Sequence, residues 1–143
     1  MVIAIIGESC VGKSTIAEKL KSRLDAEVYS GKDYLRFAKN EEEAIKLFRE
    51  KLADETQNTI YVISEKEHLA FLPQSAVKVL VTADISVIKE RFAKRTGGKL
   101  PPPVAQMLER KHGVFDDIPA DIHVVSGEDD IEAVCDRISA ICK

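Results

Sequence analysis

The 143-residue sequence is poor in several residue types that mark particular classes of protein. It contains no tryptophan and only three cysteines, five prolines and seven glycines. Three cysteines without metal-ligand spacing argue against a disulfide scaffold or a zinc module, and we expect reduced thiols in a cytoplasmic protein. The low glycine and proline content, beside 45% hydrophobic residues, excludes a collagen-like or disordered chain.

Long apolar runs and an excess of one charge are also missing. No stretch approaches the ~18 apolar residues of a membrane-spanning helix, so we expect no membrane association. The apolar residues 1–6 lack the basic flank of a signal peptide and are expected to form a strand. With 21 Lys and Arg against 24 Asp and Glu, the net charge of −3 argues against general nucleic-acid binding.

What the sequence does contain is an alternation of short apolar runs with amphipathic segments. The apolar runs predict five strands, at residues 2–6, 27–30, 58–63, 77–81 and 122–125. Helical spacing predicts helices near residues 13–24, 33–39, 41–52, 65–72, 85–96, 104–112 and 131–141. Such alternation is typical of βαβ units, so we expect an α/β fold with a mostly parallel sheet in one domain spanning residues 1–143.

The strongest motif follows the first predicted strand directly. Residues 7–14 read Gly-Glu-Ser-Cys-Val-Gly-Lys-Ser, which matches the phosphate-binding loop G-x-x-x-x-G-K-[ST]. Glycines let successive backbone N–H groups point at phosphate oxygens, and the helix that follows adds positive potential. We expect Lys13 to reach the β- and γ-phosphates of ATP and the Ser14 hydroxyl to bind Mg²⁺. The predicted nucleotide contacts of this segment are Gly7, Glu8, Ser9, Cys10, Val11, Gly12, Lys13, Ser14 and Thr15.

A second segment follows the second predicted strand, where residues 30–36 read Ser-Gly-Lys-Asp-Tyr-Leu-Arg. It resembles S-T-G-D-x-L-R of adenylate kinases. The chain is therefore similar to the nucleoside-monophosphate kinase group, with shikimate and gluconate kinases as relatives. This resemblance implies that Arg36 binds the acceptor phosphate and that Asp33 orients the acceptor or a Mg²⁺-bound water. Taken alone, Asp33 is equally compatible with a helix N-cap, and Arg36 with a solvated helix face.

A third resemblance involves the strand at 77–81 and the helix after Asp84, which look like the strand and lid helix of these kinases. Arg91 and Arg95 lie one helical turn apart and repel each other mildly, so an anion between them would be favourable. The alternative is that both arginines are solvated. Residues 96–116 take the place of the lid, whose closure would keep water from the transferring phosphoryl group.

Two further stretches extend the resemblance. Arg110, Phe115, Ala120 and Asp121 are similar to R-x-P-L-Y-x-E-x-A-D of shikimate kinases, although the spacing is longer here. This implies that Arg110 is a third phosphate clamp, with a solvated arginine as the alternative. Residues 125–127 (Val-Ser-Gly) look like the V-D-G loop that borders adenine in adenylate kinases, which adds Gly127 to the predicted nucleotide contacts.

The chain departs from the family pattern in two places. Adenylate kinases carry D-G-x-P-R after the third strand, whereas this chain has Ser64-Glu65-Lys66, so Glu65 comes one residue late. The acceptor arm, about residues 33–57, is short for a pocket that reads a base. The three histidines are isolated in the sequence and predict no metal site.

The resemblance implies a three-layer P-loop fold with a five-stranded parallel sheet in the order 2-3-1-4-5 and helices on both faces. The leading expectation is ATP- and Mg²⁺-dependent phosphoryl transfer to a small acceptor, with a nucleotide first. The alternatives are a shikimate- or gluconate-type metabolite kinase and a non-catalytic ATP or ADP sensor. We expect a monomer or homodimer whose catalytic residues are Lys13, Asp33, Arg91, Arg95 and Arg110.

Overall fold

The computed structural model describes residues 1–142 and contains five strands and seven helical segments. The strands are β1 (Val2–Ile6), β2 (Glu27–Ser30), β3 (Thr59–Ile63), β4 (Val77–Thr82) and β5 (Ile122–Val125). The α-helices are α1 (Lys13–Leu24), α2 (Glu41–Ala53), α3 (Ile85–Arg95), α4 (Pro102–Lys111) and α5 (Ile131–Ile141). Two 3-10 helices, η1 (Asp33–Phe37) and η2 (Lys66–Phe71), follow β2 and β3.

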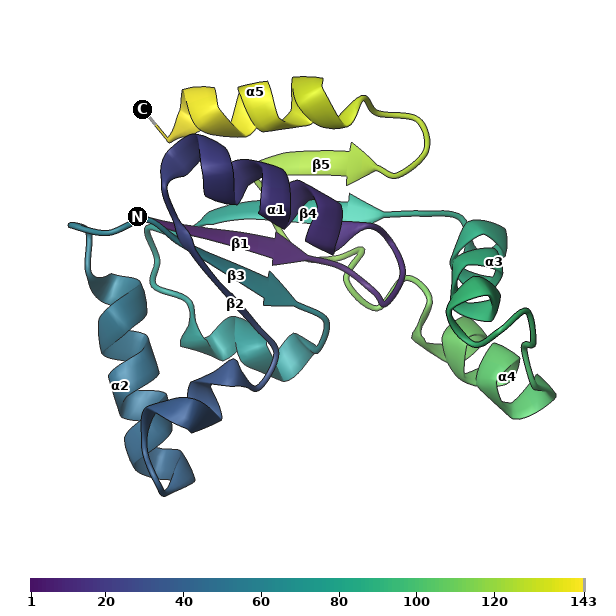
Figure 1. The fold of residues 1–143 in the computed structure, drawn as a ribbon, viewed down its shortest axis with the longest axis horizontal. Coiled ribbons are helices and arrows are strands. Elements are labelled where there is room, and N and C mark those ends of the chain that lie inside the picture. The colour runs from purple at the N-terminus through teal and green to yellow at the C-terminus, as the bar shows by residue number, and fades with distance from the viewer. Residues whose placement is uncertain (143) are drawn as a thin grey trace.

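The five strands form one parallel sheet in the order β2-β3-β1-β4-β5 (Figure 1). This order confirms the expected fold. β1 lies in the middle, where Ile6 is in register with Ile63 on one side and Leu80 on the other. All five β1 residues are buried, as a continuous apolar run predicts for a strand covered on both faces. The phosphate-binding loop therefore begins at the central strand's carboxyl end.

Side chains alternate between the two faces of β1 and build two cores. Ile3 and Ile5 pack on the face covered by α1 and α5, together with Ile16 and Ile138. Val2, Ala4 and Ile6 pack on the opposite face with aromatic residues such as Phe48 of α2. The result is three layers, with α1 and α5 above the sheet and α2 with the 3-10 helices below it (Figure 1). The α3–α4 pair extends beyond the carboxyl ends of the strands (Figure 1).

The helix boundaries correct several details of the predicted elements. α4 begins at Pro102, two residues earlier than expected. Proline fits there because the backbone N–H groups of the first helical turn have no partner within the helix, so the N–H that proline lacks is not needed. Ile141, expected in the buried stripe of α5, is 47% exposed. An 11-residue helix is about 16 Å long, whereas the four residues of β5 span about 13 Å, and the end of α5 runs past the amino end of β5 (Figure 1). Every helix among residues 1–142 is too short or too polar to cross a membrane.

Candidate active site

The phosphate-binding loop turns against the end of β4, and glycine is required for that approach. A Cβ atom on Gly7 would lie 2.5 Å from the carbonyl oxygen of Val81 and 2.8 Å from Cγ2 of Val11. Gly12, at the N-cap of α1, has a φ of 100°, a conformation that favours glycine. These two glycines hold the loop in a curled form whose N–H groups lead into the helix N-terminus.

Lys13 is the buried cation of this loop. Lys13 is the first residue of α1 and is only 6% exposed. Nζ donates hydrogen bonds to the carbonyl oxygens of Gly7 (2.7 Å) and Glu8 (2.6 Å). Burial lowers the pKa of Lys13 to about 8, and the charge of Arg95 acts in the same direction. An anionic phosphate beside the ammonium group would relieve this cost of burial.

Two cavities meet at the loop and share one arginine. The larger, ≈ 580 Å³, is bordered by α1, α3 and the segment after β5, including Gly12, Thr15, Arg91, Arg95, Ser126 and Gly127. The smaller, ≈ 270 Å³, has Lys13, Ser14, Ser30, Ser64 and Arg95 on its walls. Because Arg95 lines both, a ligand that extends from one cavity to the other would meet its guanidinium group. We refer to them below as the loop cavity and the phosphate cavity, respectively.

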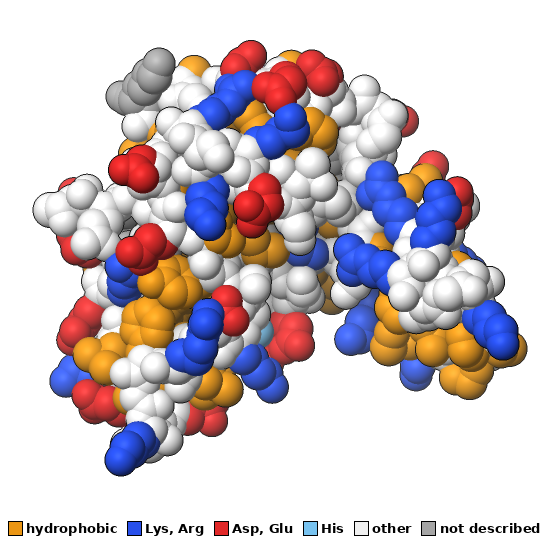
Figure 2. Space-filling model, viewed as in Figure 1, with side chains coloured by type: hydrophobic (Ala, Val, Ile, Leu, Met, Phe, Trp, Pro, Cys, Tyr) orange, Lys and Arg blue, Asp and Glu red, His pale blue; other side chains and the backbone are white. Residues whose placement is uncertain are grey.

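Helix α3 brings its arginines to the loop from 80 residues further along the chain. Nη1 of Arg91 donates a hydrogen bond to the carbonyl oxygen of Cys10 and lies 3.6 Å from the Cβ position of Gly12. Residues 85–111 carry seven Lys and Arg and two Glu, and Figure 2 shows the basic side chains gathered over α3 and α4. A chain with a net charge of −3 therefore offers a locally positive surface next to the loop, which attracts polyphosphates.

Glu8 connects the loop to the segment that follows α4. Its carboxylate accepts a hydrogen bond from the backbone N–H of Gly113 (3.0 Å) and lies 3.2 Å from Nδ1 of His112. The side chain is 10% exposed, and Glu8 lines a hollow of ≈ 620 Å³ over β4 and β5 but not the phosphate cavity. This hollow is the largest of the molecule's described cavities, and neither Lys13 nor Ser14 lines it. The buried ammonium group of Lys13 therefore lies at the loop and not at this hollow.

Asp33 and Arg36 lie on η1, next to the phosphate cavity but outside its walls. The Asp33 carboxylate accepts hydrogen bonds from the backbone N–H of Ser30 (2.9 Å) and from its hydroxyl (3.4 Å). Asp33 is not the N-cap of η1, because Lys32 occupies that position. The guanidinium of Arg36 is 3.4 Å from the Asp33 carboxylate, and its side chain is 73% exposed. Arg110, exposed on α4, lines neither the loop cavity nor the phosphate cavity.

The phosphate cavity fits a Mg²⁺ ion bound mainly through phosphates and water. Hydroxyls of Ser14, Ser30 and Ser64 line it, and none of its lining residues within 1–142 is a carboxylate. Mg²⁺ keeps several waters and accepts few protein ligands, so Ser14 together with phosphate oxygens suits it. Asp33 reaches the cavity only through Ser30, which is consistent with a water-mediated role.

Three serines that line the two cavities, Ser30, Ser64 and Ser126, were not among the predicted site residues. Each stands at or directly after the carboxyl end of a strand, β2, β3 and β5 respectively. In a parallel sheet these ends meet at one edge, which is where ligands bind in open α/β folds. The strand positions were therefore the signal that would have found them.

Comparisons with known proteins establish the fold. No protein-family model matches the chain, and no curated protein matches it. Among solved structures, the shikimate kinase of Acinetobacter baumannii in complex with shikimate aligns with a TM-score of 0.69 at 14% identity, covering 99% of this chain and 92% of that chain. A gluconokinase from Sinorhizobium meliloti gives a TM-score of 0.64 at 15% identity (99% and 94% covered). The YorR protein of Bacillus subtilis, in complex with phosphorylated GDP, aligns with a TM-score of 0.66 at 19% identity, covering 99% of this chain and 95% of that chain. The chain thus has the P-loop fold of small-molecule kinases.

Proposed function

We propose that the protein is an ATP-dependent kinase that transfers the γ-phosphoryl group of Mg-ATP to a small metabolite. The observation that carries this proposal is the shared position of Arg95, which lines both cavities beside the buried ammonium group of Lys13. Phosphoryl transfer requires little from a protein beyond positioning and stabilisation of charge on the transferring group. Two arginines and a lysine around one loop supply that charge.

Each part of the site then has a role in binding Mg-ATP. The loop N–H groups and Lys13 hold the β- and γ-phosphates, and the Ser14 hydroxyl binds the ion. Arg91 and Arg95 neutralise charge that spreads over the γ-phosphoryl oxygens. The nucleoside occupies the loop cavity, where the backbone at Gly127 borders the adenine.

A small acceptor suits the short arm between β2 and β3. Tyr34 of η1 and Phe48 of α2 are buried, with ring centroids 5.9 Å apart, so these segments turn their aromatic residues into the core. Little of the arm is left to enclose a base. The structural neighbours named for shikimate and gluconate favour the same conclusion, so a metabolite acceptor replaces the nucleotide as the leading proposal. Asp33 would orient the acceptor hydroxyl, with Arg36 and Arg110 binding an anionic group of the acceptor.

Two other functions have one supporting observation each. A nucleotide acceptor is supported by the YorR neighbour, whose structure holds phosphorylated GDP. A sensor that binds ATP without transferring phosphate is supported by Ser64, which stands where related kinases carry an acid. The acceptor experiment below separates all three.

The test is ADP release from Mg-ATP by the purified protein, measured alone and with shikimate, gluconate, other sugar acids and each nucleoside monophosphate. We expect one sugar acid or related hydroxy acid to accelerate ADP release saturably, with the phosphorylated product identified by mass spectrometry. Lys13→Met should abolish the acceleration, whereas Lys21→Met, an exposed lysine of the same helix, should retain it. Acceleration by a nucleoside monophosphate would establish the nucleotide kinase instead. Tight ATP binding without any acceleration would support the sensor.

A further inference from the structure

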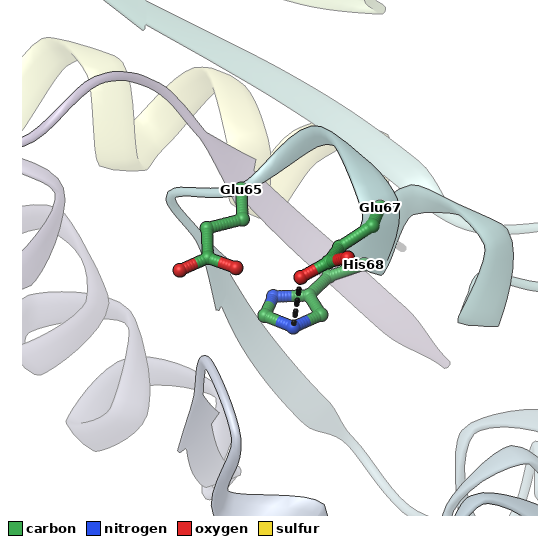
Figure 3. Close-up of side chains that lie close together, drawn as sticks. All are labelled: Glu65, Glu67 and His68. Carbon is green, nitrogen blue, oxygen red and sulfur yellow. Dashed lines mark ion pairs between the residues drawn. The ribbon is translucent and has the colours of Figure 1, made fainter.

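Three side chains outside the cavities described above gather at the start of η2. One ligand atom each from Glu65, Glu67 and His68 lies within 4.8 Å of the others (Figure 3). The two carboxylates are exposed at the surface, while the imidazole lies beneath them. The geometry points to a binding site here for a divalent transition-metal ion of the zinc type, separate from the Mg²⁺ that accompanies ATP.

The burial of His68 is the observation that distinguishes this cluster from ordinary surface acids. The residue is 2% exposed, and both of its ring nitrogens are without a hydrogen-bond partner. An imidazole buried in this way loses its hydration without compensation, which destabilises the fold. The ring is fixed by Phe71, against which it stacks at 5.7 Å, and by the edge of Tyr34 at 6.1 Å. A ligand for the nitrogen would remove the penalty.

The distances fit shared coordination better than a direct hydrogen bond. Nε2 of His68 lies 3.9 Å from Oε1 of Glu67, too far for a hydrogen bond. Two ligands of one tetrahedral zinc ion, each about 2.0–2.2 Å from the metal, are separated by roughly 3.4 Å. A side-chain adjustment of a few tenths of an ångström would therefore let both atoms bind the same ion.

The charge at the cluster also favours a bound cation. The charges of Lys32 and Lys111 act on Glu65 from nearby, but within residues 1–142 no lysine or arginine forms an ion pair with Glu65 or Glu67, and Lys66 between them pairs with Asp117. A cation bound by both carboxylates would offset the repulsion between them. A nitrogen ligand beside two carboxylates selects zinc-like ions over Mg²⁺ and Ca²⁺, which prefer oxygen ligands alone. Three protein ligands leave a fourth position for water or an acceptor group.

The cluster lies next to the carboxyl end of β3, so an ion bound there would affect the edge of the sheet where the phosphate cavity lies. Ser64, which lines the phosphate cavity, is followed directly by Glu65. An ion held by η2 would anchor this 3-10 helix next to the carboxyl end of β3. The inference does not depend on ATP or on any kinase activity, because the ligands lie outside the two nucleotide cavities.

The experiment is a Zn²⁺ titration of the nucleotide-free protein, followed by calorimetry and by the shift in Tm. We expect one Zn²⁺ per chain, a rise in Tm, and a visible absorption band when Co²⁺ replaces Zn²⁺. Glu67→Gln should weaken Zn²⁺ binding by roughly tenfold or more, since it removes one of three ligands. His68→Gln should do the same. If that variant does not fold, Glu65→Gln and Glu67→Gln carry the test because their side chains are exposed.

Two matched controls locate the ion. Glu55→Gln changes an exposed glutamate elsewhere on the surface, and His112→Gln removes the imidazole that lies beside Glu8. Both should retain the Zn²⁺ affinity of the unmodified protein. The inference is overturned if Zn²⁺ leaves Tm unchanged, if Glu67→Gln binds Zn²⁺ as tightly as the unmodified protein, or if equimolar Mg²⁺ displaces Zn²⁺.

Discussion

The guanidinium of Arg91 donates a hydrogen bond of 3.1 Å to the backbone carbonyl oxygen of Cys10, across 81 residues of sequence. This bond joins helix α3 to the phosphate-binding loop. It holds the helix that supplies positive charge against the loop, so the position of that charge does not depend on α3 alone. Arg91 retains other N–H groups for a phosphate, because a guanidinium carries five donors.

Arg91→Ala and Arg95→Ala test this arrangement. If both arginines stabilise charge on the transferring group, each substitution should lower kcat by about 10²–10³-fold. The KM for ATP should change less, since the loop and Lys13 still bind the phosphates. Steady-state kinetics with the acceptor that the ADP-release experiment identifies provide the measurement. Arg137→Ala, an exposed arginine on α5, serves as the control. Unchanged kcat in both α3 variants would remove these residues from the mechanism.

Lys13 should destabilise the ligand-free protein. Its pKa is lowered to about 8 from 10.5 because burial disfavours the ammonium form. Below pH 8 Lys13 is protonated in both the folded and the unfolded chain, so burial of its charge lowers the unfolding free energy by the full amount. From pH 8 to 10.5 the unfolded chain binds more protons than the folded chain, and the unfolding free energy rises with pH. Lys13→Met should therefore stabilise the protein at pH 7 by about 1–3 kcal/mol.

Urea denaturation of Lys13→Met and the unmodified protein at pH 7 and pH 10 measures this difference. The gap between the two should shrink at the higher pH, where the folded protein has already lost the Lys13 proton. Lys21→Met, on the exposed side of α1, should show no such pH-dependent gap. A Lys13→Met protein less stable than the unmodified one at pH 7 would mean that the bonds to Gly7 and Glu8 outweigh burial.

Gly7→Ala should damage both stability and nucleotide binding. The added methyl group would meet the Val81 carbonyl oxygen at 2.5 Å, and a backbone atom of a central strand has little room to shift. Overpacking of this kind costs about 1–3 kcal/mol. Urea denaturation and ATP titration give the two readouts. Gly31→Asn is the matched control, because it lies in open space with a φ of 52°, where asparagine is tolerated. Normal ATP affinity in Gly7→Ala would contradict the close approach.

Arg36 is predicted to act on the acceptor and not on ATP. It lies on η1, next to the phosphate cavity but outside its walls, and within residues 1–142 its one ion pair is with Asp33. Arg36→Ala should raise the KM for the acceptor about tenfold, equivalent to ~1.4 kcal/mol of binding, while the KM for ATP stays constant. Initial-rate kinetics with each substrate varied in turn separates these effects. A change in the KM for ATP alone would reassign Arg36 to the nucleotide side.

The sequence alone was sufficient for features encoded over short stretches. The phosphate-binding motif identified Lys13 and the curl of the loop, and apolar runs located all five strands. The order of the sheet came from the resemblance to P-loop kinases, and the structure confirms it. The motif also suffices for Ser14, since one loop carries both residues into the same cavity.

Features that depend on distant segments required the tertiary structure. The serines at 30, 64 and 126 come to the two cavities because parallel strands end at one edge, and the motifs that contain Ser30 and Ser126 did not by themselves assign these side chains to a site. His68 appeared isolated because its relation to metal chemistry depends on its burial beneath Glu65 and Glu67, which aromatic packing around η2 produces. Local periodicity and motif chemistry thus determined the elements and the phosphate loop. Long-range packing decided which side chains meet at the ends of the strands, because those residues lie far apart in the sequence. It also decided the burial of His68, whose partners Glu65 and Glu67 are close to it in the sequence.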